Sequence, residues 1–361
     1  MMKYLKYVAA AIFAALVFGG NVYAAQVENP RVQWMKGKNG IMVHWLFLRY
    51  DEKNPEQNDK TANAFNLEAF MKDFDATGAE WLIFTIGQNS GGYASPNSVI
   101  DKYCGAGHTS KRDIVLEVAK AVHERGKRFI AYIPCEVRGN KTVRKGFEWN
   151  DDINDPKLEF QKRYTDALRE WSLRYGKLCD GWWVDGAYSD IAPHLDWKLW
   201  HDALRAGNPD AAVTFNAGIV KTNRILLLHP DHDYLAGEVN VLTDGKIRGG
   251  TDNANPETFL PSKDYYTGTK SLWHVLMPMD SFWAAYSPWD DWAKVPWKRE
   301  NVTGPKRIHP PVYADENLGS FLAYMKKIGA AVTINMGVTA EGRLSPDSIA
   351  QLQRIAAANK K

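Results

Sequence analysis

Short apolar runs alternate with helical patterns along most of this sequence. The runs suit strands buried on both faces, and the longer segments repeat apolar residues every three to four positions. The predicted strands are residues 41–45, 81–86, 129–133, 181–185, 212–215, 234–236, 272–276 and 330–334. The predicted helices are residues 67–77, 113–125, 157–175, 197–206, 316–328 and 346–358.

This alternation favours a (β/α)8 barrel of the TIM type over an open, doubly wound sheet. No G-x-G-x-x-G motif follows the first strand, as a dinucleotide-binding sheet would require. We therefore predict a single catalytic domain over residues 25–361.

In such a barrel the chemistry lies at the carboxyl ends of the strands. A polar residue there also has an ordinary interpretation, which is to satisfy the backbone of the next loop. The polar or aromatic residues that we place at strand ends are His44, Trp45, Gln88, Asn89, Glu136, Asp185, Asn216, Glu238, His274 and Asn335.

Asp185 stands out because it ends the apolar strand Trp182-Trp183-Val184 and precedes Gly186. A carboxylate leaving a buried strand, with a second carboxyl group nearby, meets the requirement of glycosidic cleavage, in which one group attacks and the other donates a proton. The alternative is a structural aspartate that caps the turn at Tyr188 or Ser189, and the residues alone do not decide between the two.

Composition narrows the class of partner. The 361 residues include 45 Lys and Arg against 42 Asp and Glu, a net charge of +3, which falls to +1 if Lys3 and Lys6 are removed with a leader. General attraction to nucleic acid or to an anionic membrane is not expected. The 14 Trp, 16 Tyr and 14 Phe exceed what a core usually needs and suit the flat faces of sugars.

Residues 1–24 have the features of a signal peptide: a basic start, an apolar stretch from Val8 to Phe18, and small residues before a cleavage site near Ala24. The apolar stretch is too short for a membrane span. We expect export to the periplasm or the medium. Among the cysteines Cys104, Cys135 and Cys179 at most one disulfide can form. The potential ligands His229, Asp231, His232 and Asp233 share one loop but match no metal motif, so we predict no metal site.

Several segments, in order, resemble the α-L-fucosidase family of glycoside hydrolases, known as family 29. Residues 40–45, Gly-Ile-Met-Val-His-Trp, are similar to the family's Gly-Met-Phe-Ile-His-Trp. Residues 110–115 and 122–126 resemble its Lys-Arg-Asp-Leu-Val and Arg-Glu-Arg-Gly segments. Residues 183–186, Trp-Val-Asp-Gly, resemble the Trp-Phe-Asp-Gly that carries its nucleophile, and residues 334–343 resemble its Leu-Asn-Val-Gly-Pro-Thr-Pro-Asp-Gly.

The resemblance implies a retaining exo-glycosidase that acts on an α-L-fucoside-like sugar of an oligosaccharide or polysaccharide, without a cofactor. Asp185 would form a covalent glycosyl-enzyme, and a glutamate would serve as acid and then as base. His44 would hydrogen-bond a sugar hydroxyl, and Trp45 and Trp183 would contact the sugar. The β-sandwich that usually follows the family's barrel is not expected here.

Two departures from the family pattern affect the site. Where the family has paired histidines that grip sugar hydroxyls, this sequence has Gln88 and Asn89, which predicts a different or decorated sugar. Where a Trp-Glu is common before a segment like residues 281–286, this sequence has a histidine, His274. We take Glu238 as the acid/base and His274 as a contact to substrate, with His274 and then Glu136 as the other candidates for the acid. The alternative for Glu238 is an ion pair with Lys246 or Arg248.

A second class of function remains open at this stage. If both the histidine pair and the acid have been lost, the barrel would be a carbohydrate-binding pseudoenzyme without turnover. Asp185 favours an enzyme, because a binding module has no reason to bury a lone carboxylate. The oligomeric state does not follow from the sequence.

Overall fold

The fold is known from a computed structural model, which describes residues 28–45, 53–218, 225, 227–239, 241–243, 246–248, 261–280 and 310–359. The predicted signal peptide at residues 1–24 and the segment at residues 281–286 lie outside these ranges. Export therefore stays a prediction.

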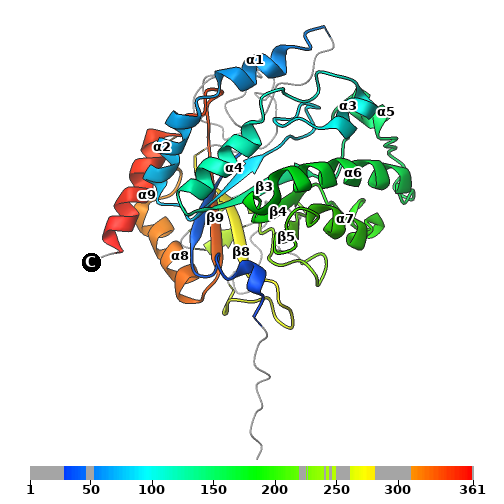
Figure 1. Ribbon diagram of the computed structural model, residues 1–361. Helices are drawn as coiled ribbons and strands as arrows, with labels where there is room; N and C mark the ends of the chain where they lie inside the picture. Colours follow the sequence, from blue (N-terminus) through cyan, green and yellow to red (C-terminus); the bar gives the residue numbers. More distant parts are fainter. Residues whose placement is uncertain are drawn as a thin grey trace, which may run out of the picture.

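A curled sheet of seven parallel strands forms the centre of the protein (Figure 1). Its order is β5-β4-β3-β2-β1-β9-β8. The strands are β1 (Asn39–Val43), β2 (Trp81–Thr85), β3 (Arg128–Pro134), β4 (Gly181–Asp185), β5 (Ala212–Phe215), β8 (His274–Pro278) and β9 (Ala331–Met336). A short antiparallel hairpin, β6 (Val241–Thr243) with β7 (Lys246–Arg248), stands apart from this sheet.

An irregular extended segment, residues 233–239, occupies the place of an eighth strand. It forms parallel bridges at Tyr234 with Leu272, two residues before β8, and at Glu238 with Leu276 in β8. On its other side the Asp233 amide donates a hydrogen bond to the carbonyl of Val213 in β5. The predicted (β/α)8 architecture is thus confirmed, and the described residues include no β-sandwich.

Helices cover the outside of the sheet (Figure 1). In that view α2, α8 and α9 lie on one side of the strands and α6 and α7 on the other. The helices are α1 (Gln57–Ala64), α2 (Leu67–Thr77), α3 (Ser98–Cys104), α4 (Ile114–Glu124), α5 (Lys141–Gly146), α6 (Leu158–Tyr175), α7 (Trp197–Leu204), α8 (Asp315–Lys327) and α9 (Pro346–Ala358).

Alternation along each strand divides the core into two layers. Ile41 and Val43 of β1 belong to the large outer cluster between strands and helices, whereas Met42 belongs to a smaller cluster inside the barrel. Inside the barrel, aromatic side chains fill the space below the strand ends, among them Trp81, Tyr132, Trp183 and Tyr234. The interior is therefore packed, and a site can open only at an end of the barrel.

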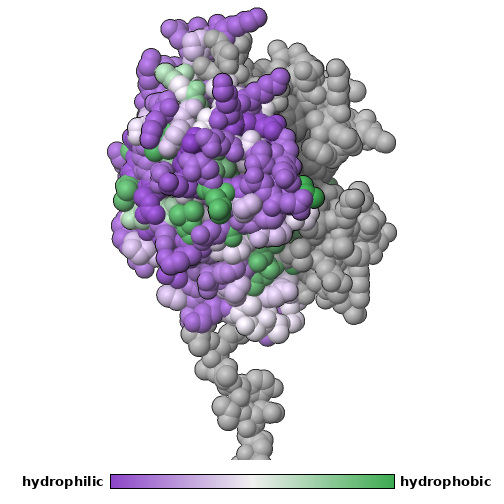
Figure 2. All heavy atoms as spheres, turned by 90° about the vertical axis from the view of Figure 1, so that its right-hand side faces the viewer, coloured by the Kyte–Doolittle hydropathy of each residue, from purple (hydrophilic) through white to green (hydrophobic). Residues whose placement is uncertain are grey.

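The outer surface over α6 and α7 is mostly hydrophilic, with only scattered apolar residues (Figure 2). No helix in the described part of the chain is long and apolar enough to cross a membrane. All three cysteines are free, and Cys135 and Cys179 are buried.

Candidate active site

Asp185 lies where the sequence predicts, as the last residue of β4 at the carboxyl end of the barrel. Gly186 follows with φ of 79°, a left-handed conformation that glycine adopts without strain. A side chain at Gly186 would also press on the Glu136 side chain, 2.8 Å from its Cγ. The turn therefore needs glycine, and it leaves the Asp185 carboxylate partly exposed above the packed interior.

Three side chains donate hydrogen bonds to the Asp185 carboxylate. The Tyr132 hydroxyl, at 2.5 Å, and the Gln88 amide, at 3.1 Å, share Oδ2. The Asn216 amide reaches Oδ1 at 2.9 Å. Both oxygens of the carboxylate are thus oriented by hydrogen-bond donors.

Glu238 shares its amide donor with Asp185. Nδ2 of Asn216 donates to Oε2 of Glu238 at 2.5 Å. The two acceptor oxygens therefore lie no farther apart than the sum of these two hydrogen-bond lengths, about 5.4 Å. Burial, followed by the charge of Asp185, raises the pKa of Glu238 to about 8, so this carboxyl group keeps its proton at neutral pH.

Glu136, the reserve acid, is buried beside this pair but has different partners. Asn89 donates its side-chain amide to Oε1, and the backbone amide of Arg138 donates to Oε2 at 2.8 Å. Burial raises the pKa of Glu136. The hydrogen bonds described for Glu136 reach neither Asn216 nor Asp185, but the charge of Asp185 also acts on Glu136.

His44 lies inside the barrel, as expected for a residue that faces the site. Its ring meets Tyr132 edge to face, with centroids 4.6 Å apart, and it hydrogen-bonds Asn335. Burial lowers its pKa to about 4, so the imidazole is neutral. His44 can therefore present a neutral donor or acceptor close to Asp185.

Gln88 and Asn89 do reach the site, but they bind the protein's own groups. The Gln88 amide donates to Tyr132 and Asp185, and its oxygen accepts the backbone amide of Asn89. The Asn89 amide donates to Glu136, and its oxygen accepts from the backbone of Gly139. The role in sugar choice stays a prediction, and the geometry favours a role in holding the carboxylates.

The two predicted tryptophan contacts are not supported by the packing. Trp45 belongs to the outer core, 1% exposed, where it packs on Phe65 and Phe84. It faces away from the barrel interior because side chains alternate along the strand. Trp183 is inside the barrel but one layer below Asp185, stacked on Tyr132 with centroids 5.3 Å apart.

The expectation that His274 lies at a carboxyl strand end is wrong. His274 is the first residue of β8, not its end, and it is fully buried. Its ring nitrogens bond the carbonyls of Leu235 and Ala236 and the hydroxyl of Thr333. The apolar run in the sequence begins at residue 272, two residues before the regular strand. His274 therefore lies at the amino end of β8 and not at its carboxyl end.

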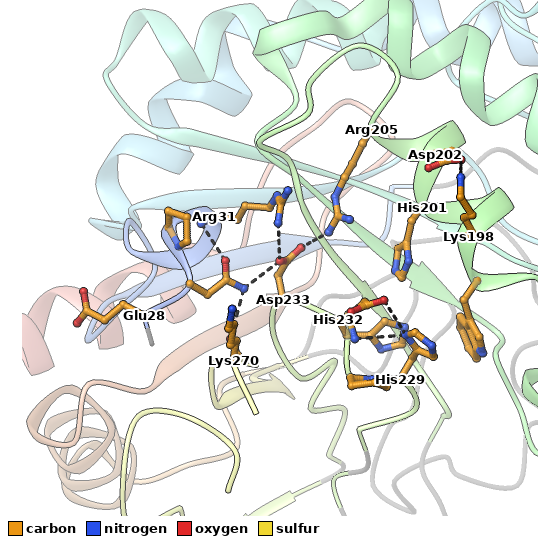
Figure 3. A pocket seen from close by; sticks show the side chains of 15 residues that line it. Glu28, Arg31, Lys198, His201, Asp202, Arg205, His229, His232, Asp233 and Lys270 are labelled. Atoms are coloured by element: carbon orange, nitrogen blue, oxygen red, sulfur yellow. Dashed lines mark hydrogen bonds and ion pairs between the residues drawn. The ribbon is translucent and has the colours of Figure 1, made fainter. Parts of the chain in front are cut away.

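The loop with His229, Asp231, His232 and Asp233 lines a separate pocket (Figure 3). Asp233 pairs there with Arg205 at 2.6 Å and with Arg31 at 3.7 Å, and it lies at the start of the 233–239 segment. Nδ1 of His229 lies 3.8 Å from Oδ2 of Asp231. Nowhere in the described ranges does a group of three or more His, Cys, Asp or Glu side chains suit a metal ion.

Tyr132 and Asn216 make more contacts to the candidate site than the sequence indicated. Asn216 is one of the polar residues at strand ends, but nothing in the sequence joins it to Asp185 and Glu238. Tyr132 is hidden in an apolar strand, although its even spacing from Ile130 puts it on the interior face. The side chains of Lys246 and Arg248 are outside the described part, so their pairing with Glu238 stays untested.

Comparison with known proteins places this geometry in a family context. The model of the α-L-fucosidase family matches residues 47–224, just under half of the chain, a range that includes Asp185 and Asn216 but not Glu238. No curated protein sequence matches.

Solved structures show the same fold at low sequence identity. An endo-fucoidan hydrolase of glycoside hydrolase family 107 is 15% identical, with a TM-score of 0.64, over 92% of this chain and 93% of that one. A second endo-fucoidan hydrolase of family 107 is 15% identical, with a TM-score of 0.62. The match covers 92% of this chain and 54% of that one.

α-L-Fucosidase isoenzyme 1 from Paenibacillus thiaminolyticus is 16% identical, with a TM-score of 0.58, over 92% of this chain and 75% of that one. These structural likenesses concern the fold, and the family match adds a likeness in sequence. The chain therefore resembles the α-L-fucosidase family and is similar in fold to the fucosidase-like glycoside hydrolases.

Proposed function

We propose that this protein is an exported, retaining exo-glycosidase for an α-L-fucoside-like sugar, with Asp185 as nucleophile and Glu238 as acid/base. The observation that carries the proposal is the carboxyl pair joined by Asn216. Inverting glycosidases separate their two carboxyl groups by about 6.5 to 9.5 Å and retaining ones by about 5 to 5.5 Å, so an upper bound of about 5.4 Å favours retention. The resemblance to the α-L-fucosidase family supports the choice of sugar.

In the first step an Asp185 oxygen bonds to the anomeric carbon while the glycosidic C–O bond breaks, and Glu238 gives its proton to the leaving oxygen. In the second step Glu238 removes a proton from water, the water oxygen attacks the anomeric carbon, and the electron pair returns to Asp185. Because its pKa is raised, Glu238 still holds a proton at neutral pH and can donate it in the first step. Tyr132 and Gln88 orient Asp185 for the attack.

Hydrolysis of an aryl α-L-fucoside, followed by NMR of the first sugar product, tests both activity and retention. Asp185→Asn should remove nearly all turnover while the fold persists, because the amide fills the same space but cannot attack. Asp202→Asn is the matched control, since this exposed residue of α7 pairs only with Lys198 among its described contacts. Near-normal turnover in Asp185→Asn would refute the nucleophile.

Leaving groups of different acidity test the acid. Glu238→Ala should lose far more activity on a natural glycoside than on a dinitrophenyl glycoside, whose phenolate leaves without a proton. Added azide should rescue the second substrate by attacking the glycosyl-enzyme. If Glu136→Ala shows this pattern and Glu238→Ala does not, the roles of the two glutamates are reversed.

Endo-hydrolysis of a fucose-containing polysaccharide is the second candidate. It is favoured by the likeness to an endo-fucoidan hydrolase over 93% of that enzyme's length. Loss of fucoidan viscosity without hydrolysis of the aryl α-L-fucoside would support it. Retention on fucose-coated resin without turnover of either substrate would instead support the pseudoenzyme.

A further inference from the structure

Asn216 is fixed by its backbone beside the turn that carries Asp185. It directly follows β5, and its amide donates to the carbonyl of Val184 at 2.7 Å. Its carbonyl accepts from the amide of Ala187 at 2.9 Å. These two hydrogen bonds join the Asn216 backbone to Val184 and Ala187, on either side of Asp185. The backbone position of Asn216, a residue that is 2% exposed, is therefore fixed.

The Asn216 side chain divides its two N–H groups between two carboxyl groups. Nδ2 donates to Oδ1 of Asp185 and to Oε2 of Glu238. An amide nitrogen carries two hydrogens and no acceptor, and the Asp185 carboxylate can only accept, so the amide nitrogen must face Asp185, where it also meets the Glu238 oxygen. One donor group therefore bridges the two residues on which the proposed reaction depends.

The following step rests on the proposed function. Before reaction Asp185 is a carboxylate and Glu238 is protonated; after glycosyl transfer Asp185 is a neutral ester and Glu238 is a carboxylate. The pair thus carries one negative charge throughout, and the charge moves from Asp185 to Glu238 and back. A donor that touches both residues stabilises the charge in either place without moving.

We propose that Asn216 is a positioning residue that holds this single negative charge between Asp185 and Glu238, and that it supports both halves of the reaction. Whichever of the two carboxyl groups is charged accepts a charge-assisted hydrogen bond from the Asn216 amide. Tyr132 and Gln88 cannot take this part, because in the described contacts they reach Asp185 and not Glu238.

Titration of Glu238 measures the bridge without any substrate. The Asn216 hydrogen bond lowers the pKa of Glu238 against the larger effect of burial. Asn216→Leu should therefore raise the Glu238 pKa further, as followed by NMR of ¹³C-labelled glutamate carboxyl groups with Glu238→Gln to assign the signal. The rings around the pair stay neutral from pH 5 to 9, since the pKa of His44 is lowered to about 4 and those of Tyr132 and Tyr188 are raised.

Thr214→Val is the matched control. Thr214 lies two residues earlier on the same face of β5 and is buried, but it contacts neither carboxyl group in the described structure. This variant should leave the Glu238 signal and the turnover unchanged. Asn216→Asp provides a near-isosteric second variant if leucine prevents folding: it lacks the two N–H donors, and its activity should rise as pH falls and its own carboxyl group gains an O–H.

Kinetics complete the test. Asn216→Leu should lower kcat/KM at least about 100-fold, which is the scale of a lost charge-stabilising donor. The alkaline limb of the pH profile of kcat/KM should move to higher pH together with the pKa of Glu238. An unchanged Glu238 titration in both Asn216 variants would overturn the proposal. If the titration shifts but wild type hydrolyses no glycoside, the proposed function fails while the charge-holding bridge stands.

Discussion

Replacing Glu238 by glutamine should stabilise the folded protein, and the gain should grow with pH. Burial raises the pKa of Glu238 from its ordinary value of 4.5 to about 8. Between these values the unfolded chain releases the proton while the folded chain keeps it. The unfolded state then binds fewer protons, so the free energy of unfolding of the wild type falls as pH rises through this window.

The size of the effect follows from the same two values. At about 1.36 kcal/mol per pKa unit, the change corresponds to about 5 kcal/mol once pH exceeds 8. Glu238 is partly exposed, and water at the opening screens its charge, so we expect about 2 to 5 kcal/mol. Glutamine has nearly the same shape and still offers an oxygen to Asn216, so the variant keeps the hydrogen bond and removes only the titration.

Urea unfolding of both proteins at intervals from pH 4 to 9 measures this difference. The two free energies of unfolding should agree near pH 4, separate above pH 4.5, and differ by a constant amount above about pH 8. Comparing the two proteins cancels the titration of all groups that they share. A difference that does not change across this range would refute the reasoning, because it would mean that Glu238 ionises alike in both states.

Two further changes test the site and the core. Gln88→Ala should lower kcat about 10- to 100-fold with little change in KM on an aryl α-L-fucoside, because a hydrogen bond to the charged Asp185 is lost; a raised KM with unchanged kcat would instead show that Gln88 binds sugar. Gly40→Ala should cost about 3 kcal/mol in the free energy of unfolding, because a side chain there would overlap the Trp81 indole. Gly319→Ala in α8, with its nearest neighbour at 3.5 Å, is the control, and an equal loss in both variants would contradict this account.

The strands and longer helices could be predicted because their signals are local. The helix at residues 67–77 has the predicted bounds, since Asn66 caps its start and Gly78 ends it with a left-handed φ of 70°. The helix at residues 346–358 likewise starts at Pro346 after the capping Ser345. The short helices α1, α3 and α5 were not predicted, because they are brief and lack a sustained apolar repeat.

The site was harder to predict than the fold. Asp185 could be found because an acid at the end of an apolar strand is visible in the sequence. Its partners depend on strand register, which pairs Asp185 with Pro134 and Val184 with Phe215 and so sets Tyr132 and Asn216 beside the carboxylate. Such neighbours are about 30 to 50 residues away along the chain, beyond the reach of local patterns.

Three amide side chains hold the three carboxyl groups of this barrel end: Gln88 holds Asp185, Asn89 holds Glu136, and Asn216 holds Asp185 and Glu238. An amide does not titrate, so this arrangement orients carboxyl groups without adding charge that would change with pH. Histidines at positions 88 and 89 could gain a proton and pull both neighbouring carboxylates toward their charged forms. With Gln88 and Asn89 at these positions, the proton balance of the site is left to the carboxyl groups themselves: burial keeps the proton on Glu238, and the amide donors orient Asp185.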